Sequence, residues 1–159
     1  MLDSDSIAPF SIQTIDFKGE IKEFSSQNLN GQYLVLYFYP RDLTSGCTQQ
    51  AKDFSSLFQN FQQFNAQILG ISRDSLKKHQ KFIEKENLPF ALGADENEKV
   101  CTLFDVIKNK KMYGKDVRGI ERSTFLYAPN GALIQQWRKV KVPNHVQEVL
   151  QTLANFCQK

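Results

Sequence analysis

Residues 33–54 read YLVLYFYPRDLTSGCTQQAKDF, and this stretch decides the fold that the sequence predicts. Its first half is an unbroken run of aliphatic and aromatic residues, which is typical of a strand covered on both faces of a sheet. Pro40 ends that run, and Cys47 follows just before an amphipathic helical pattern begins. We therefore expect a buried strand, a loop, and then a helix whose first turn carries a cysteine.

The position of Cys47 at the start of a helix favours a reactive thiol. A cysteine attacks as its thiolate, and the unpaired backbone N–H groups of a first helical turn favour an anion beside them. The preceding residues, Thr44, Ser45 and Gly46, are small or polar and argue against a packed-core position. Cys47 is therefore the candidate nucleophile.

Length and composition indicate one globular domain over residues 1–159. The chain is 41% apolar with a net charge of +3, and a chain of this length can bury one sizeable core. The N-terminus, MLDSDSIAPF, has two acids and no apolar run, so we expect no signal peptide, no membrane span and a cytoplasmic location. Three widely spaced cysteines do not make a structural disulfide framework, so any disulfide is expected to be transient.

Strand and helix patterns alternate around the quoted stretch. Residues 10–16 and 20–24 predict an N-terminal β-hairpin. Apolar residues at helical spacing over residues 48–64 predict a helix of about five turns, and residues 66–72 follow as a second buried strand. This βαβ unit implies parallel strands joined by a right-handed crossover.

The second half of the chain completes an α/β domain with the thioredoxin fold, a central mixed sheet flanked by helices, with the N-terminal hairpin as an extension. Polar cap residues, prolines and apolar periodicity set its expected elements. These are a helix capped by Asp74 or Ser75 and ended before Pro89, an extended segment at 90–94, a helix capped by Asp95 or Asn97 and reaching Ile107, a polar loop at 108–119, a strand hairpin at 123–127 and 132–138, and a last helix opened by Pro143.

Two groups of residues argue against other classes of function. Lys108, Lys110 and Lys111 cluster in the predicted loop without interleaved aromatic residues, which indicates a solvated surface and no nucleic-acid site. His79 and His145 lie far apart with no ligand-like neighbours, so we expect surface or hydrogen-bonded histidines and no metal site.

Three motifs carry a resemblance to a known family. They are Pro40-x-x-x-Thr44-x-x-Cys47, the strand that begins at Arg122 (RSTFL), and the segment MYGK at residues 112–115. Together they resemble the peroxiredoxins, specifically the bacterioferritin comigratory protein or Q-type subfamily. The resemblance extends from about residue 8 to the last helix.

The resemblance implies a thiol peroxidase that reduces hydrogen peroxide and organic hydroperoxides without a metal or cofactor. It implies that Cys47 is the peroxidatic cysteine, that Thr44 hydrogen-bonds the peroxide, that Arg122 lies beside the sulfur, and that Pro40 shields it. Fixed donors and a cation stabilise the charge that develops when an O–O bond breaks. Two plainer interpretations remain: Arg122 as a surface ion-pair partner, and Pro40 as a strand terminator only.

The sequence departs from many relatives where a second thiol is expected. A sulfenic acid on Cys47 must be reduced by another thiol. The two resolving positions familiar in the family correspond to Lys52 and Ile83, so both lack a cysteine. Gln50 replaces a common glutamate, which removes a negative charge and keeps a hydrogen-bonding group.

Cys101 and Cys157 are the other two cysteines, and each lies on the apolar side of a predicted helix. We favour a one-cysteine mechanism in a monomer, with thioredoxin, glutaredoxin or a small thiol as the external reductant. Alternatives are a two-cysteine peroxidase resolved by Cys101, and a redox sensor or holdase that uses reversible oxidation of Cys47. A disulfide oxidoreductase would suit the fold, but the chain lacks a C-x-x-C pair.

Overall fold

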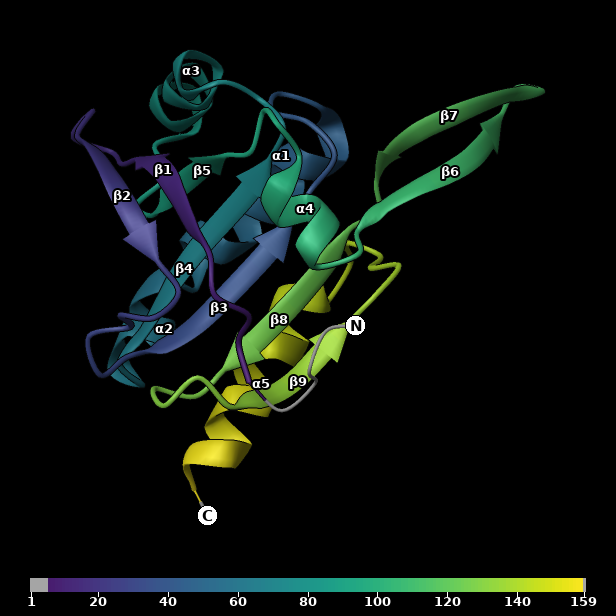
Figure 1. Cartoon of the computed structure of the whole chain (residues 1–159). Coiled ribbons are helices and arrows are strands. Elements are labelled where there is room, and N and C mark those ends of the chain that lie inside the picture. The colour runs from purple at the N-terminus through teal and green to yellow at the C-terminus, as the bar shows by residue number, and fades with distance from the viewer. Residues whose placement is uncertain (1–5, 159) are drawn as a thin grey trace.

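The computed structural model describes residues 6–158 and contains a seven-stranded mixed sheet and a separate two-stranded hairpin that projects from one side (Figure 1). The order of the strands in the main sheet is β2-β1-β5-β4-β3-β8-β9. They are β1 (Ser11–Ile15), β2 (Ile21–Ser25), β3 (Tyr33–Phe38), β4 (Ala66–Ser72), β5 (Ala91–Ala94), β8 (Ser123–Tyr127) and β9 (Leu133–Trp137). The hairpin consists of β6 (Ile107–Met112) and β7 (Lys115–Ile120). The helices are α1 (Ser45–Ser56), α2 (Phe58–Gln63), α3 (Leu76–Glu86), α4 (Lys99–Leu103) and α5 (His145–Cys157).

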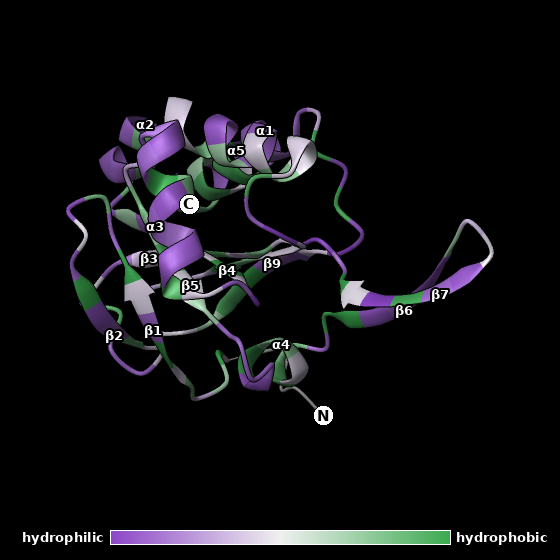
Figure 2. Cartoon of the chain, turned by 90° about the horizontal axis from the view of Figure 1, so that it is seen from above, coloured by the Kyte–Doolittle hydropathy of each residue, from purple (hydrophilic) through white to green (hydrophobic). Residues whose placement is uncertain are grey.

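Helices cover both faces of the main sheet, but unequally (Figure 2). Four helices, α1, α2, α3 and α5, pack over one face, and Phe54, Phe82 and Val146 belong to the core beneath them, here called the first core. Helix α4 covers the other face, where Val100 and Cys101 belong to the second core. No helix within residues 6–158 combines the length and apolar content needed to cross a bilayer.

Strand β3 lies between the two cores. It pairs in parallel with β4 and antiparallel with β8. Val35 and Tyr37 face the first core, and Leu36 faces the second. Gly70 lies opposite Tyr37 on β4, and a Cβ there would lie 2.8 Å from the Tyr37 ring, so the glycine makes room for the aromatic side chain. The apolar run is the central strand, as predicted.

The predicted thioredoxin fold is confirmed. The β3-α1-β4 unit has parallel strands, the β8-β9 hairpin and α5 complete the sheet and its cover, and the N-terminal β1-β2 hairpin extends the sheet at one edge. The helix predicted over 48–64 begins earlier and breaks at Leu57 into α1 and α2. Ser55 and Ser56 donate side-chain hydrogen bonds to backbone carbonyls of α1, and such bonds compete with helix continuation.

The region after α4 differs most from the prediction. The helix predicted to reach Ile107 ends at Leu103, because Asp105 has a positive φ of 54° and the Arg138 guanidinium donates to the Phe104 and Asp105 carbonyls. The polar loop predicted over 108–119 is wrong, since these residues form the β6-β7 hairpin. Its strands have few buried side chains, so the alternation that marks a half-buried strand is missing.

Candidate active site

Cys47 is the third residue of α1, which starts just beyond the carboxyl end of β3. A five-residue gap after Tyr39 is enough to bring the chain from the sheet to the helix, and the Thr48 N–H donates to the Thr44 carbonyl as the first helical bond there. The Cys47 side chain is 2% exposed and belongs to the first core. The predicted position at the amino end of a helix is confirmed. The expectation that Thr44, Ser45 and Gly46 exclude a packed-core position is wrong, because the Cys47 side chain is buried among residues of the first core.

Arg122 brings a cation to the sulfur of Cys47. Its Nη2 lies 3.6 Å from Cys47 Sγ, and its Nη1 donates to Gln50 Oε1 at 2.6 Å. Arg122 is positioned by the sheet, because the next residue, Ser123, pairs with Phe38 at the carboxyl end of β3. The predicted contact between Arg122 and the sulfur is present, and the planar guanidinium reaches two groups of α1 at once.

Gly46 provides the space for this approach. A Cβ at residue 46 would lie 3.3 Å from Arg122 Nη2, closer than an ordinary van der Waals contact. A side chain there would push the guanidinium away from Cys47. Gln50 contributes one helical turn later, because residues three apart lie on the same side of a helix. Its amide oxygen accepts from Arg122 where a carboxylate would add a negative charge.

Pro40 and Thr44 lie in the loop between β3 and α1, and both are exposed. Thr44 is the N-cap of α1 with an extended backbone, but its hydroxyl donates to the Arg41 carbonyl at 3.0 Å and makes no capping bond. Pro40 follows the buried Tyr39 and ends the central strand. The structure brings Cys47 and Arg122 into contact, while the Thr44 hydroxyl bonds within its own loop.

A buried polar network holds the same loop against α3, and sequence reasoning did not predict it. Asp42 accepts from the Tyr39 hydroxyl at 2.5 Å, and its other oxygen lies 2.6 Å from His79 Nδ1. His79 Nε2 lies 2.8 Å from the Gly93 carbonyl, which can only accept, so Nε2 carries a proton. On the other side of the ring, Nδ1 faces the Asp42 carboxylate. The Asp42 and His79 side chains are both fully buried.

A second interaction anchors this loop through its backbone. The Asp42 N–H donates to Asp74 Oδ2 at 2.8 Å, and the Ser72 hydroxyl donates to the same oxygen at 2.7 Å. Asp42 is thereby held by β4, α3 and its own loop. Since the loop runs directly into α1, these bonds fix the direction from which Cys47 enters the site.

Two buried polar atoms at the site lack a hydrogen-bond partner among residues 6–158: the Tyr37 hydroxyl and Gln50 Nε2. Burial, then the negative charges of Asp42 and Cys47, raise the pKa of Tyr37 well above its usual value, so its hydroxyl keeps its proton. Both atoms are hydrogen-bond donors. The first core therefore contains a neutral donor and an amide donor close to the charged groups of the site.

The other two cysteines lie away from Cys47. Cys101 belongs to the second core, on the opposite face of the sheet. Cys157 ends α5 and neighbours Tyr33, the first residue of β3, whereas Cys47 follows the last residue of that strand. All three cysteines are free thiols. Cys101 and Cys47 belong to the cores on opposite faces of the main sheet, and a disulfide would need their Cα atoms within about 7 Å.

The histidines are hydrogen-bonded, in agreement with the sequence interpretation. His79 is bonded as described, and His145 Nε2 lies 2.8 Å from the Thr124 hydroxyl. Within residues 6–158, no three His, Cys, Asp or Glu side chains are grouped to hold a metal ion. The groups that the structure places at Cys47 are the thiol itself, the Arg122 guanidinium and nearby hydrogen-bond donors.

Comparisons with known proteins identify a family and several similar chains. The model of the AhpC/TSA family matches residues 4–136. The chain is 49% identical over 146 residues to Peroxiredoxin Bcp of Bacillus subtilis, which covers 91% of this chain and 93% of that protein. Among solved structures, a cysteine-to-serine mutant of PrxQ from Xylella fastidiosa superposes with a TM-score of 0.87 at 40% identity, covering 99% and 98% of the two chains. A structure of the Xanthomonas campestris bacterioferritin comigratory protein, studied for alkyl peroxide reduction, superposes with a TM-score of 0.82 at 44% identity. The match covers 92% of this chain and 91% of that chain.

Proposed function

The chain belongs to the AhpC/TSA family and, within it, to the Bcp or Q-type peroxiredoxins, and on that basis we propose that it is a thiol-dependent peroxidase acting through Cys47. One observation supports this proposal most directly: the Arg122 guanidinium lies 3.6 Å from Cys47 Sγ at the amino end of α1. Both the cation and the helix terminus favour the thiolate form of the nucleophile. The substrates proposed are hydrogen peroxide and organic hydroperoxides, in line with the alkyl peroxide reduction described for the Xanthomonas relative.

In the first step, the Cys47 thiolate attacks one oxygen of the peroxide. A bond forms between sulfur and that oxygen as the O–O bond breaks, and the other oxygen leaves with the electron pair and takes up a proton. The products are Cys47 sulfenic acid and water or an alcohol. Arg122 stabilises the negative charge on the sulfur before attack and on the leaving oxygen during it, because its donors are fixed in place by Gln50.

The loop residues take supporting parts in this proposal. Thr44 lies at the N-cap of α1, where its hydroxyl donates to the Arg41 carbonyl and its oxygen can accept a hydrogen bond from a bound peroxide. Pro40 has no backbone N–H and fixes the start of the loop, which limits the approach of water to the sulfur. These roles of Thr44 and Pro40 rest on the family motif and their location.

Reduction of the sulfenic acid is proposed to use an external thiol. Cys101 and Cys157 lie on the other face and at the other end of the sheet, respectively, so neither neighbours Cys47 in the folded chain. A first external thiolate attacks Cys47 Sγ, a mixed disulfide forms, and the sulfenic oxygen leaves as water. A second external thiol then displaces Cys47 as a thiolate, and the external pair is oxidised to a disulfide.

Three expectations from the sequence stay predictions: one domain over residues 1–159, a monomer, and a cytoplasmic location. The free thiols of Cys47, Cys101 and Cys157 are compatible with a reducing compartment.

The test compares Cys47→Ser with Cys101→Ala in peroxide consumption, with dithiothreitol as reductant. Cys47→Ser should lower turnover by about a thousandfold or more, because a serine hydroxyl at neutral pH is a far weaker nucleophile than a thiolate. Cys101→Ala should retain it. Normal turnover by Cys47→Ser would refute the proposal, and stoichiometric oxidation of Cys47 without turnover under any thiol would favour a sensor instead.

A further inference from the structure

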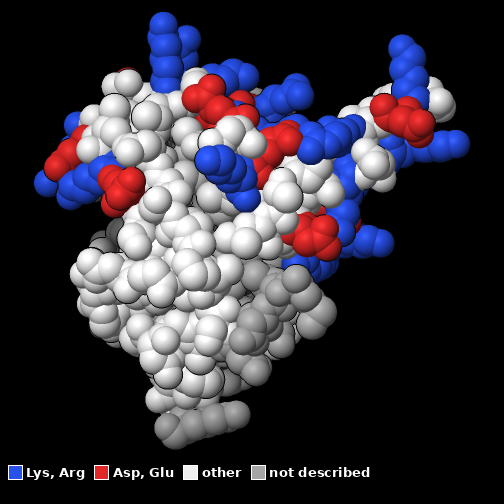
Figure 3. Space-filling view, in the orientation of Figure 1, with Lys and Arg blue, Asp and Glu red and all other residues white. Residues whose placement is uncertain are grey.

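The projecting β6-β7 hairpin carries the net positive charge of the molecule. Residues 107–120 contain five basic side chains and one acidic one, a net charge of +4, while the whole chain has +3. The remaining residues therefore carry −1 together. Figure 3 shows basic groups along the hairpin with a single acidic group near its tip. The charge is thus gathered on one element.

The two faces of the hairpin differ in how these charges are compensated. Because paired residues share a face, the register places Asn109, Lys111, Asp116 and Arg118 on one face. On that face Lys111 lies opposite Asp116, and Arg118 donates to both oxygens of Glu98 at 2.6 and 2.7 Å. Hydrogen bonds from Arg118 and then Arg73 lower the pKa of Glu98 to about 2, so the pairing persists at neutral pH. On this face Arg118 is paired with Glu98, and the remaining cation, Lys111, has the acidic Asp116 as its cross-strand neighbour.

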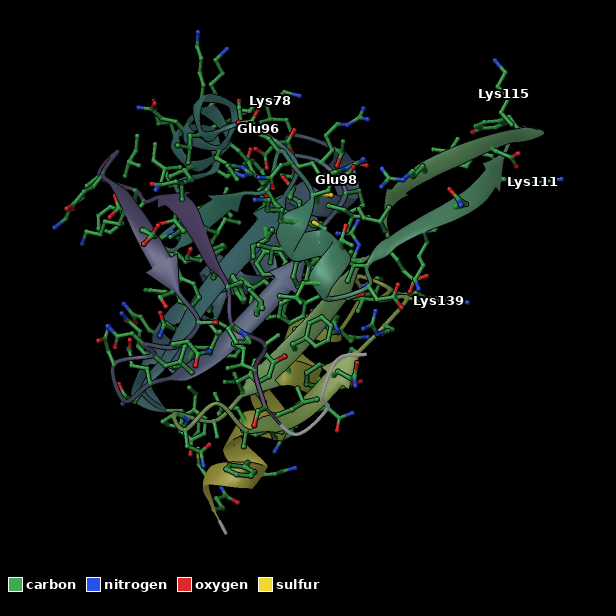
Figure 4. All side chains as sticks on the ribbon, in the orientation of Figure 1. Lys78, Glu96, Glu98, Lys111, Lys115 and Lys139 are labelled. Atoms are coloured by element: carbon green, nitrogen blue, oxygen red, sulfur yellow. The ribbon has the colours of Figure 1, made fainter. Side chains whose placement is uncertain are left out.

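The opposite face, here called the cationic face, consists of Lys108, Lys110, Met112, Lys115 and Val117. Lys108 forms an ion pair with Asp105, but Lys110 and Lys115 form none among the described residues. Met112 is 50% exposed and Val117 41% exposed between these cations. Figure 4 shows Lys115 at the outer end of the hairpin, far from Glu98 at its base. Such a mixture of cations and apolar side chains complements an acidic protein surface with an apolar centre.

The hairpin adjoins the site through both its sequence and its base. Strand β7 ends at Ile120, and only Glu121 separates it from Arg122. At the base of the hairpin, Gly119 pairs with Lys108 of the cationic face, and a Cβ at Gly119 would lie 3.8 Å from the side chain of Arg73, the residue that follows β4. A partner bound to this face would therefore lie beside the carboxyl ends of the parallel strands, from which α1 and Cys47 start.

We propose that the cationic face docks an acidic thioredoxin-type protein that supplies the external thiols to oxidised Cys47. This inference rests on the proposed function, since it identifies the reductant of that same site. In the reaction, two thiols of the partner become a disulfide, Cys47 sulfenic acid becomes a thiol, and one water is released. A nucleic acid would also meet the cations, but the cationic face contains no aromatic residue for base stacking and has apolar side chains between its cations.

The test uses the double variant Lys110→Glu/Lys115→Glu. Turnover is measured with an acidic bacterial thioredoxin, kept reduced by its NADPH-dependent reductase, and separately with dithiothreitol. The matched control is Lys77→Glu/Lys81→Glu on α3, where both lysines are exposed and form no ion pair among residues 6–158. The variant should raise KM for thioredoxin about tenfold, because each reversal replaces attraction by repulsion, and should weaken its dependence on salt. The turnover of the hairpin variant with dithiothreitol should equal that of the unmodified protein. The control variant should have the same KM for thioredoxin as the unmodified protein.

The outcomes separate the two proposals. An unchanged KM for thioredoxin in the hairpin variant would overturn the docking inference, as would turnover with dithiothreitol but none with thioredoxin. Binding of a duplex or single-stranded oligonucleotide that the same variant abolishes, with KM for thioredoxin unchanged, would assign the face to nucleic acid instead. Absence of turnover by the unmodified protein with either reductant would contradict the proposed peroxidase function itself.

Discussion

Cys47 and Cys101 are each the third residue of a helix, and both side chains are buried, so the two pockets allow a direct comparison. The Arg122 guanidinium contacts the first sulfur. At the second, burial and then the Asp95 carboxylate raise the pKa of the Cys101 thiol far above its usual value. The two buried thiols therefore differ in their charged neighbours, a guanidinium at Cys47 and a carboxylate at Cys101.

Each helix also follows a buried aspartate, and the two carboxylates point to different partners. Asp42 precedes α1, and its oxygens are taken up by Tyr39 and His79. Asp95 precedes α4, and its oxygens accept from the backbone N–H groups of Val100 and Cys101 at 3.0 and 2.7 Å. The first arrangement leaves the helix terminus free for the cysteine sulfur. The second places a negative charge at the terminus, which opposes formation of a thiolate there.

The largest expected effect comes from removing His79. In His79→Leu, Asp42 loses its ion-pair partner while remaining buried, so we expect the free energy of unfolding to fall by about 3–5 kcal/mol. Urea denaturation at neutral pH measures this change. The double variant His79→Leu/Asp42→Asn should recover part of the loss, since it removes the unpaired charge. Equal stability of His79→Leu and the unmodified protein would show that the network does not hold the Cys47 loop.

Arg122→Gln makes the charge at the Cys47 pocket more like that at Cys101. We expect peroxide reduction with dithiothreitol to slow by about a hundredfold, because the variant removes the fixed cation from the reacting sulfur. Arg122→Lys should recover only part, since an ammonium cannot contact Cys47 and Gln50 together as the planar fork does. Arg118→Gln is the matched control on the hairpin. Equal rates of peroxide reduction for Arg122→Gln and Arg118→Gln would show that the guanidinium beside Cys47 does not distinguish its pocket from that of Cys101.

The smallest expected effect is on the pH dependence of folding stability, to which a buried group on each face of the sheet contributes. Burial lowers the pKa of His145, on the Cys47 face, to about 4, so the folded chain binds fewer protons there than the unfolded chain. Its stabilisation is present above about pH 6.5 and is lost as the pH falls towards 4. Cys101 has the opposite sign: its stabilisation is full below the usual thiol pKa and is lost at higher pH.

Denaturation across this pH range in two variants checks the assignment. His145→Gln should reduce the loss of stability in acid, and Cys101→Ala should reduce the loss in alkali while leaving the acid side unchanged. If His145→Gln has the same acid profile as the unmodified chain, the acid sensitivity arises elsewhere.

The sequence predicts one pocket better than the other for physical reasons. The apolar run of β3 and the small residues before Cys47 are local signals, so they identify a strand and a helix start without knowledge of the fold. The contact of Arg122 with Cys47 joins residues 75 positions apart, and only the family motif predicted it. The Asp42–His79 pair depends on the packing of α3 against the loop, and nothing in the spacing of the two residues indicates it.

The sequence does not predict the hairpin at residues 107–120, because its strands lack the apolar alternation that identifies a half-buried strand. Its strands project from the sheet, so neither face is covered along most of their length and no apolar alternation is required. Tyr113 and Gly114 both have positive φ values, 54° and 79°, as in a two-residue hairpin turn. Glycine favours that conformation and tyrosine does not, which weakened the turn signal.

The most direct test of the account is the intact mass of the protein after one equivalent of hydrogen peroxide without reductant, with peptide mapping of the cysteines. Because the Arg122 guanidinium contacts Cys47 whereas burial and the Asp95 carboxylate disfavour ionisation of Cys101, the account predicts the gain of oxygen at Cys47, with Cys101 and Cys157 still reduced. Loss of two hydrogens, with Cys47 linked to either of the other cysteines, would contradict it and would show that the chain resolves its own sulfenic acid.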